Sequence, residues 1–285
     1  MGSSLSRVQV VVVAGILVAA TVAQAETRKE YRFKVGRRSS VSINNQFGPV
    51  SVKAGTAKWV VVVALLNSDH VEVDQSQRGS RVSLVSHLLP GADATTGQVE
   101  YQVLVPPNAS VNLHSTTGPI HAEKLNGDLV LEGNTANVDV REVSAGHVHI
   151  KTLNGSVTLT DVRDGHVEIT SLAGNVVMTS VNGPLVQVNS SSGKIHYDGD
   201  FGDAGQYALT SHTGDIEAEA PSYASIEVTA RSVQGQVDND FLLEPEHTSF
   251  PIKAGSAFAG TINKAASSVK LFSFSGKIHL KKKLK

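Results

Sequence analysis

The chain has 285 residues, an almost balanced charge of 25 Lys and Arg against 26 Asp and Glu, and no Cys. This balance argues against a nucleic-acid binder, because binding to phosphates normally needs a clear excess of basic residues. The lack of Cys excludes disulfides, thiolate metal sites, iron-sulfur clusters and cysteine nucleophiles. Since 40% of the residues are hydrophobic and only 18% are charged, an ordered core is expected.

Residues 1–25 have the pattern of a secretory signal peptide. Arg7 supplies a positive start, Val8 to Val22 is almost entirely apolar, and Ala23-Gln24-Ala25 offers small residues for signal peptidase. The sequence therefore predicts a bacterial protein that is exported to the periplasm, the cell surface or the medium. An uncleaved membrane anchor is the alternative, because the apolar stretch is close to the shortest length that spans a bilayer.

The next segment, residues 26–116, is predicted to form irregular N-terminal coils. Apolar runs or alternations indicate strands at residues 31–35, 59–66, 71–74, 81–86 and 99–105. The eight-residue run from Trp59 to Leu66 is too short to cross a membrane and is typical of a buried strand.

Residues 117–240 contain a repeat of 19 residues. Turn residues recur at this interval in two interleaved series: Gly127, Gly146, Gly165 and Pro184, and Ala136, Gly155, Gly174 and Gly193. Apolar residues follow each turn two and four places on, as in Val157 and Leu159 after Gly155. This alternation is the periodicity of a strand with one buried face. Two strands and two turns per 19 residues predict one coil of a β-solenoid.

The turns carry two further patterns. Gly often follows Asn or Asp, which favours a backbone with positive φ at the glycine. A third apolar position recurs seven residues after the turn residue, and its members are Val143, Leu153, Val162, Leu172 and Val181.

The predicted fold is an all-β, single-stranded β-solenoid, or β-helix, with about 19 residues per coil and irregular capping strands at both ends. A β-sandwich is the alternative, although it does not explain a shared register over consecutive strands. Both series gain two residues near residues 199–203. Residues 241–285 are predicted to form the C-terminal cap, with a loop over 254–268 and a last strand pair at 269–274 and 277–280. Residues 26–285 are thus predicted to be a single domain.

The sequence resembles the bacterial "putative adhesin" family. The segments that carry the resemblance are the Val-Pro-Pro-Asn-Ala-Ser-Val segment at residues 105–111, the Ser-Thr-Thr-Gly-Pro-Ile step after it, the repeated Asn-Gly turns and the closing Phe-Ser-Gly-Lys-Ile-His-Leu. They cover roughly residues 40–280. The resemblance implies an exported β-solenoid domain of unassigned function, because these motifs are structural and do not specify chemistry.

Motifs that mark enzymes are missing from the sequence. It contains no Gly-x-Ser-x-Gly elbow, no His-Glu-x-x-His and no phosphate-binding Gly-x-x-x-x-Gly-Lys. The sequence therefore predicts neither catalysis nor a cofactor. The predicted function is a non-catalytic adhesin or scaffold that contacts a cell-envelope component or another protein, and not nucleic acid. An envelope-stress sensor or ligand-binding periplasmic module is one alternative, and a polysaccharide-active β-helix enzyme is another.

Two clusters of side chains are candidate binding sites. The 19-residue period places His147 beside His166 and His149 beside Glu168 on one solvent face, which predicts a transition-metal site made of these four residues. A solvated strand face that happens to use His is the alternative. The tail Lys281–Lys285 could contact an anionic surface, or it could serve as a charged end that blocks strand addition.

Overall fold

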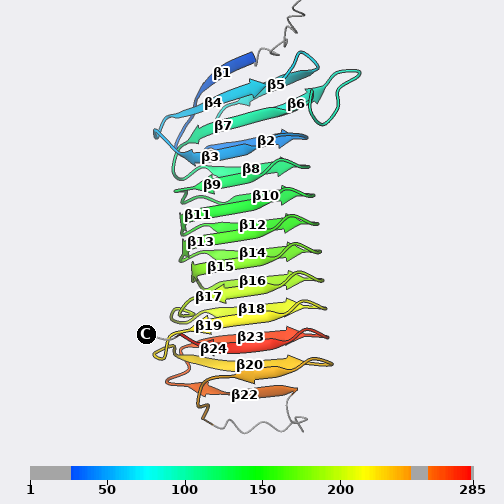
Figure 1. Cartoon of the computed structure of the whole chain (residues 1–285). Coiled ribbons are helices and arrows are strands. Elements are labelled where there is room, and N and C mark those ends of the chain that lie inside the picture. Colours follow the sequence, from blue (N-terminus) through cyan, green and yellow to red (C-terminus); the bar gives the residue numbers. More distant parts are fainter. Residues whose placement is uncertain (1–26, 245–255, 284–285) are drawn as a thin grey trace, which may run out of the picture.

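The computed structural model describes residues 27–244 and 256–283. All the secondary-structure elements in these ranges are β-strands. They form two sheets of 12 strands. In each sheet the strands follow one another along the same axis, and the two sheets enclose a single core (Figure 1). Within the described ranges there is no helix with the length and hydrophobicity that crossing a bilayer requires. The predicted signal peptide lies outside the described residues.

Sheet A contains the following strands in spatial order: β1 (Thr27–Lys34), β4 (Trp59–Leu66), β7 (Val99–Val105), β3 (Val50–Ala54), β9 (Ile120–Glu123), β11 (Val138–Ser144), β13 (Val157–Arg163), β15 (Val176–Val181), β17 (Ile195–Asp198), β19 (Ile216–Ala220), β24 (Ile278–Lys282) and β21 (Val237–Asn239). Sheet B contains, from the opposite end: β22 (Ala257–Ile262), β20 (Ile226–Ser232), β23 (Ser267–Ser273), β18 (Gln206–Ser211), β16 (Leu185–Ser190), β14 (His166–Ser171), β12 (His147–Thr152), β10 (Leu129–Gly133), β8 (Ser110–Ser115), β2 (Ser40–Asn45), β6 (Arg81–Leu88) and β5 (Val71–Arg78).

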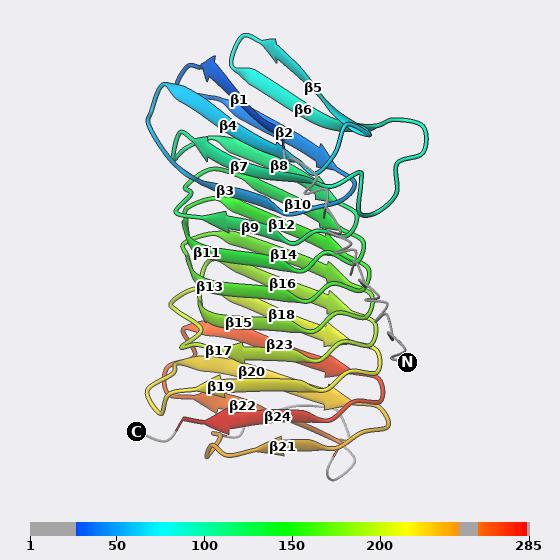
Figure 2. The same cartoon turned by 45° about the horizontal axis from the view of Figure 1, so that its top comes forward.

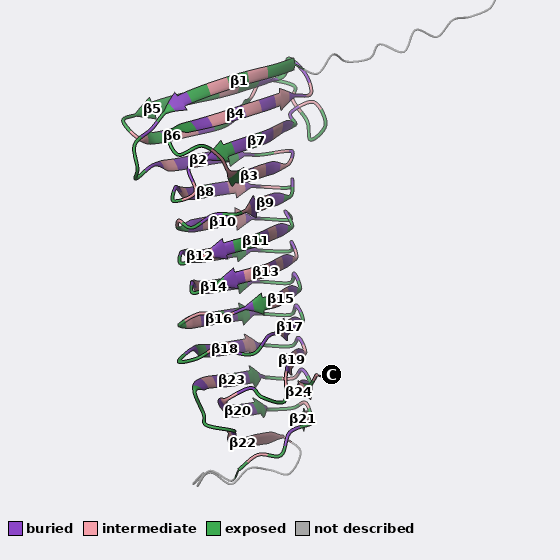
Figure 3. Ribbon diagram, turned by 90° about the vertical axis from the view of Figure 1, so that its left-hand side faces the viewer, coloured by how far each residue is buried: buried purple, intermediate pink, exposed green. Residues whose placement is uncertain are grey.

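In the regular region each coil gives one strand to each sheet, and neighbouring coils pair in parallel at the predicted register. Val157, for example, lies between Val138 and Val176 in sheet A. The apolar residues predicted two and four places after the turn residues, from Leu129 to Tyr197, are all at most 1% exposed. Buried and exposed residues alternate along the strands (Figure 3). The predicted β-solenoid is therefore confirmed.

The turn from sheet B to sheet A is built around a buried hydroxyl and a glycine three residues later. The Ser171 hydroxyl donates to the Gly174 carbonyl at 2.9 Å, and the same contact recurs in other coils at Ser115, Thr152 and Ser190. A Cβ atom on Gly174 would lie 1.8 Å from the Gly155 carbonyl oxygen, with no positive φ at Gly174. The expectation of a positive φ was therefore wrong here, because glycine is needed for close packing of coils.

The turn from sheet A to sheet B is different. Glu142, Asp161 and Ser180 have φ of 52°, 54° and 55°, so each coil places a non-glycine residue in the left-handed region. Glu142 and Asp161 lie opposite each other and are both left out of the pairing between β11 and β13. The third apolar position consequently divides into two groups: Val143, Val162 and Val181 are buried at this turn, whereas Leu153 and Leu172 lie exposed at the other.

The residues inserted between β17 and β18 contribute to a buried cluster of aromatic rings. Phe201 is fully buried and stacks on Tyr197 with ring centroids 4.4 Å apart, while Tyr207 packs edge-on at 5.0 Å. The Tyr197 hydroxyl donates to the Val181 carbonyl and accepts from the Phe201 backbone N–H. Burial raises the pKa of Tyr207 to about 12, so this cluster stays neutral and hydrogen-bonded.

Both ends of the stack are interlocked, which the sequence did not predict. At the N-terminal end β2 and β3 lie between the β6/β7 and β8/β9 coils. At the C-terminal end β23 and β24 lie between β18/β19 and β20/β21 (Figures 1 and 2). The predicted last strand pair is thus a whole coil divided between the two sheets. The expected loop over 254–268 was also wrong in part, because β22 within it pairs antiparallel with β20.

The close approach of glycines predicts a graded effect of an added methyl group. Gly174→Ala would place Cβ 1.8 Å from the Gly155 carbonyl oxygen, whereas Gly165→Ala would place it 2.8 Å from the Gly146 oxygen. Because the backbone must move much further in the first case, we expect a loss of about 3 kcal/mol or more for Gly174→Ala and about 1 kcal/mol for Gly165→Ala. Urea unfolding followed by circular dichroism measures both, and equal losses would contradict this explanation.

Candidate functional site

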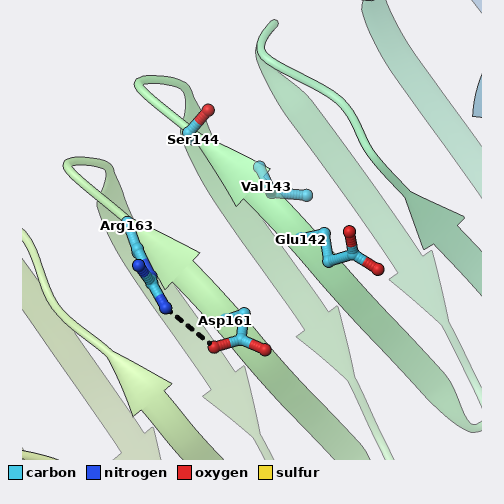
Figure 4. Close-up of a pocket in the computed structure, with 5 residues that line it drawn as sticks. All are labelled: Glu142, Val143, Ser144, Asp161 and Arg163. Carbon is cyan, nitrogen blue, oxygen red and sulfur yellow. Dashed lines mark hydrogen bonds and ion pairs between the residues drawn. The ribbon is translucent and has the colours of Figure 1, made fainter.

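Two surface hollows lie on strands of sheet A. One of about 340 Å³ is lined by Glu142, Val143, Ser144, Asp161 and Arg163 (Figure 4). Arg163 contacts the Asp161 carboxylate at 3.3 Å, and the Ser144 hydroxyl donates to the Asn126 side chain at 2.9 Å. Arg163 and Ser144 therefore both have partners within the protein, and the partner of the Ser144 hydroxyl is an amide oxygen, which is not a base that could activate it.

A second hollow, of about 430 Å³, lies at the N-terminal end of sheet A. Val61, Val63 and Leu104 provide its apolar lining, while Lys53 and Glu100 border it. The Lys53 ammonium contacts the Glu123 carboxylate at 2.9 Å. The residues that line this hollow are outward-facing residues of β3, β4 and β7, apart from the buried Val103, and they include no His and no metal-binding pair of carboxylates.

The predicted histidine cluster lies on the outer face of sheet B at the expected register. His147 on β12 faces His166 on β14, and their ring centroids are 4.6 Å apart at an interplanar angle of 49°. On the same two strands the Nδ1 atom of His149 lies 3.4 Å from the Glu168 carboxylate. The structure therefore brings the four residues together as two neighbouring pairs, and their ability to bind a metal stays a prediction.

Other outward histidines of the stack face a carboxylate of the next coil. His114 lies 3.7 Å from Glu132, His121 lies 3.0 Å from Asp139, and His196 lies 3.3 Å from Glu217. Each contact joins two adjacent coils on the solvent side. His147 and His166 differ because each contacts another imidazole ring.

A second cluster of possible metal ligands was missed by the sequence analysis. Within the described part of the chain, His196, Glu217 and Glu219 are the group whose ligand atoms all lie within 4.8 Å of one another. The Lys281 ammonium contacts Glu217 at 2.9 Å and Glu219 at 3.6 Å. This contact with Lys281 lowers the pKa of the Glu217 carboxyl. Lys281 therefore already supplies a positive charge to both carboxylates.

The basic tail is bound to the stack as far as the structure describes it. Lys281 bridges the two glutamates, Lys283 contacts Asp198, and the Lys282 ammonium lies 5.9 Å from the Phe241 ring centroid. Two of these three cations are thus paired within the protein, which leaves less charge for an anionic surface. That contact remains untested, and the last two residues lie outside the described range.

An apolar ridge runs along the corner where sheet B turns into sheet A. We call Leu153, Leu172, Ser191, His212, Phe274 and Val233 the corner ridge; their backbone N–H groups bond to the preceding coil in this order. The side chains of Leu153, Leu172, Val233 and Phe274 are 36–51% exposed. His212 and Phe274 stack with ring centroids 5.0 Å apart, and Phe272 is exposed two residues before. Sequence reasoning missed this ridge because a recurring apolar position does not show by itself whether it faces the core or the solvent.

Charged side chains on the outer face of sheet A join its N-terminal coils. Glu123 contacts both Lys53 and Lys124 at 2.9 Å and His121 at 3.3 Å. The hydrogen bonds from Lys53, Lys124 and His121 lower the pKa of the Glu123 carboxyl to about 2. This carboxylate is therefore ionised under nearly all conditions and links strands β3 and β9.

This lowered pKa predicts an acid-dependent loss of stability. Because the Glu123 pKa falls from an ordinary value of 4.5 to about 2, its contribution is complete above about pH 4.5 and disappears as the pH falls towards 2. Glu123→Gln should lower the melting temperature at pH 7 and make it less sensitive to acid in that window. Glu72→Gln is the control, because Glu72 is exposed and has no ion pair among the described residues. Identical melting curves for the Glu123→Gln and native proteins would contradict this role.

Comparisons with known proteins place this geometry in context. The Toastrack family model (DUF4097) matches residues 38–281. No curated protein matches the sequence. Among solved structures, the chain is similar to a putative adhesin from Bacteroides fragilis at 13% identity and a TM-score of 0.43, with 91% of this chain and 99% of that chain covered. A putative adhesin from Parabacteroides distasonis aligns at 13% identity and a TM-score of 0.40, covering 91% and 98% of the two chains.

A putative cell adhesion protein from Clostridium sporogenes also aligns, at 13% identity and a TM-score of 0.30, over 90% of this chain and all of that one. The family match covers almost the entire described stack, from the start of β2 to β24. It confirms the resemblance drawn from the turn motifs. The chain belongs to the Toastrack family.

Proposed function

We propose that this protein is an exported, non-catalytic scaffold of the bacterial cell envelope that binds an envelope protein through its corner ridge. The observation that carries this proposal is the alignment of Leu153, Leu172, Phe274 and Val233 along one corner, each more than a third exposed. Aligned apolar groups on a rigid surface favour a protein partner, because their burial against another apolar surface is favourable.

The shape of the stack supports a binding role. Parallel strands with a continuous core hold the ridge residues at fixed spacing, so little conformational entropy is lost when a partner docks. The stacked His212 and Phe274 rings offer a flat aromatic contact, and aromatic residues are enriched in protein interfaces. An extended strand or groove of the partner could therefore follow several coils.

The non-catalytic part of the proposal rests on the described hollows. Arg163 in the first hollow contacts Asp161, and Lys53 in the second contacts Glu123 outside that hollow. An enzyme that cuts polysaccharides needs a substrate cleft with an acid and a base or nucleophile. The short turns of the regular coils leave little chain from which to build such a cleft. Export is proposed from the pattern of residues 1–25.

Cell fractionation followed by an envelope-binding assay tests the proposal. The full gene is expressed in the bacterium that encodes it, and cell fractions are probed for the exported protein. We expect it in the envelope or periplasmic fraction with its N-terminus at Glu26. Purified protein should bind isolated envelopes saturably, and protease treatment of the envelopes should abolish binding. Recovery only in the cytoplasm, or binding that survives proteolysis, would contradict the proposal.

Ridge variants show which surface binds. Leu153→Thr with Leu172→Thr, and separately Phe272→Thr with Phe274→Thr, should each weaken envelope binding about tenfold or more, since each pair removes two apolar contacts. The matched control is Trp59→Thr with Leu104→Thr, which removes two side chains of similar exposure at the N-terminal end. Melting temperatures are compared so that only folded variants are scored. Equal weakening by the control would refute the ridge as the binding surface.

A further inference from the structure

We propose that His147, His149 and His166 bind one divalent transition-metal ion on the outer face of sheet B, with Glu168 orienting His149. This inference is independent of the corner ridge and of the proposed function. It starts from the strand geometry: His147 and His149 are two residues apart on β12, so their side chains leave the same face of the sheet. His166 lies directly opposite His147 on β14.

The two opposed rings are already at a suitable separation. Their centroids lie 4.6 Å apart and the planes are inclined by 49°. Ligand nitrogens that share a tetrahedral Zn²⁺ at about 2.0–2.1 Å are roughly 3.3 Å apart. Rotation about the side-chain bonds of two solvent-accessible imidazoles brings two nitrogens to that distance without any movement of the strands.

The third proposed ligand, His149, is oriented by the Glu168 carboxylate. The Nδ1 atom of His149 lies 3.4 Å from Glu168 Oε2, so the proton on Nδ1 can be held by the carboxylate while Nε2 remains free. Metal-binding histidines commonly donate their other N–H to a carboxylate, which fixes the ring and raises its basicity as a ligand. Glu168, predicted from sequence as a fourth ligand, is therefore assigned an orienting role, and the fourth coordination position is open to water.

The electrostatic surroundings of His147 and His166 differ from those of His114, His121 and His196. His114, His121 and His196 each lie within 4 Å of a carboxylate from the neighbouring coil. Within residues 27–244 and 256–283, His147 and His166 have no such ion pair and contact each other instead. An imidazole that is neutral carries one lone pair, and a metal ion is a partner that two adjacent rings can share.

The cluster of His196, Glu217 and Glu219 is the obvious competitor, and it is a poorer site. Its ligand atoms are close together, but the Lys281 ammonium lies 2.9 Å from Glu217 and would have to leave before an ion could bind. The all-imidazole site requires no such displacement. Imidazole donors suit Zn²⁺, Ni²⁺ and Cu²⁺ rather than Mg²⁺ or Ca²⁺, which prefer oxygen.

Calorimetric titration of the purified exported protein with ZnCl₂ tests the site. The native protein should bind one Zn²⁺ per chain, and His147→Ala with His166→Ala should weaken this binding at least about a hundredfold, since two of three ligands are lost. The matched control is His114→Ala with His196→Ala, which removes two outward histidines elsewhere in the stack and should leave the isotherm unchanged. Melting of each metal-free variant verifies that it is folded.

The role of Glu168 has its own measurement. Glu168→Gln should weaken Zn²⁺ binding about tenfold, the usual effect of removing an orienting carboxylate, while the stoichiometry stays at one. Substitution of MgCl₂ for ZnCl₂ should give no binding. Identical isotherms for the native protein and the His147/His166 double variant would overturn the site, and full affinity in Glu168→Gln would overturn the role assigned to Glu168.

Discussion

The contact between a turn glycine and the carbonyl oxygen of the preceding coil determines how closely the coils can stack. At Gly155, Gly174 and Gly193 a methyl group would lie 2.0 Å or less from the carbonyl oxygen of the preceding coil. The buried hydroxyl of Thr152, Ser171 or Ser190 bonds to that same turn. Because these coils repeat the same corner, their strands lie at one register, and the apolar side chains stack into a continuous core.

A stack of this kind exposes strand edges and an open core at each end. In this protein both ends are closed by an inserted coil. The β2/β3 and β23/β24 coils are inserted one coil inside the stack, so each of them pairs with a coil on both sides. The outermost strands β1, β5 and β22 run antiparallel to their neighbours, whereas β21, at the C-terminal edge of sheet A, pairs in parallel with β24. Insertion of a coil resists fraying, and antiparallel covering strands discourage further parallel addition at the edges.

Local periodicity explains what could be predicted from sequence. Turn spacing predicted the register that places His147 beside His166, because one 19-residue period determines which residues are neighbours. It could not predict the inserted coils, since their pairings join residues distant in sequence. Nor could it separate Val162 from Leu172, which share a place in the repeat but lie at different corners, one buried and one exposed. The ion pairs of Lys281 and the orientation of His149 towards Glu168 depend on side-chain conformations that no period encodes.

Removal of one coil tests the central claim most directly, namely that the 19-residue unit stacks independently of its position. Deletion of residues 155–173 removes β13 and β14 and joins Asn154 to Gly174, which restores the turn and the pairing of β12 with β16. Deletion of residues 155–164 removes half a coil and exchanges the two kinds of corner for the rest of the chain. Thermal unfolding followed by circular dichroism should show a cooperative β-sheet transition for the first protein and none for the second. Cooperative unfolding of both, or of neither, would contradict the account.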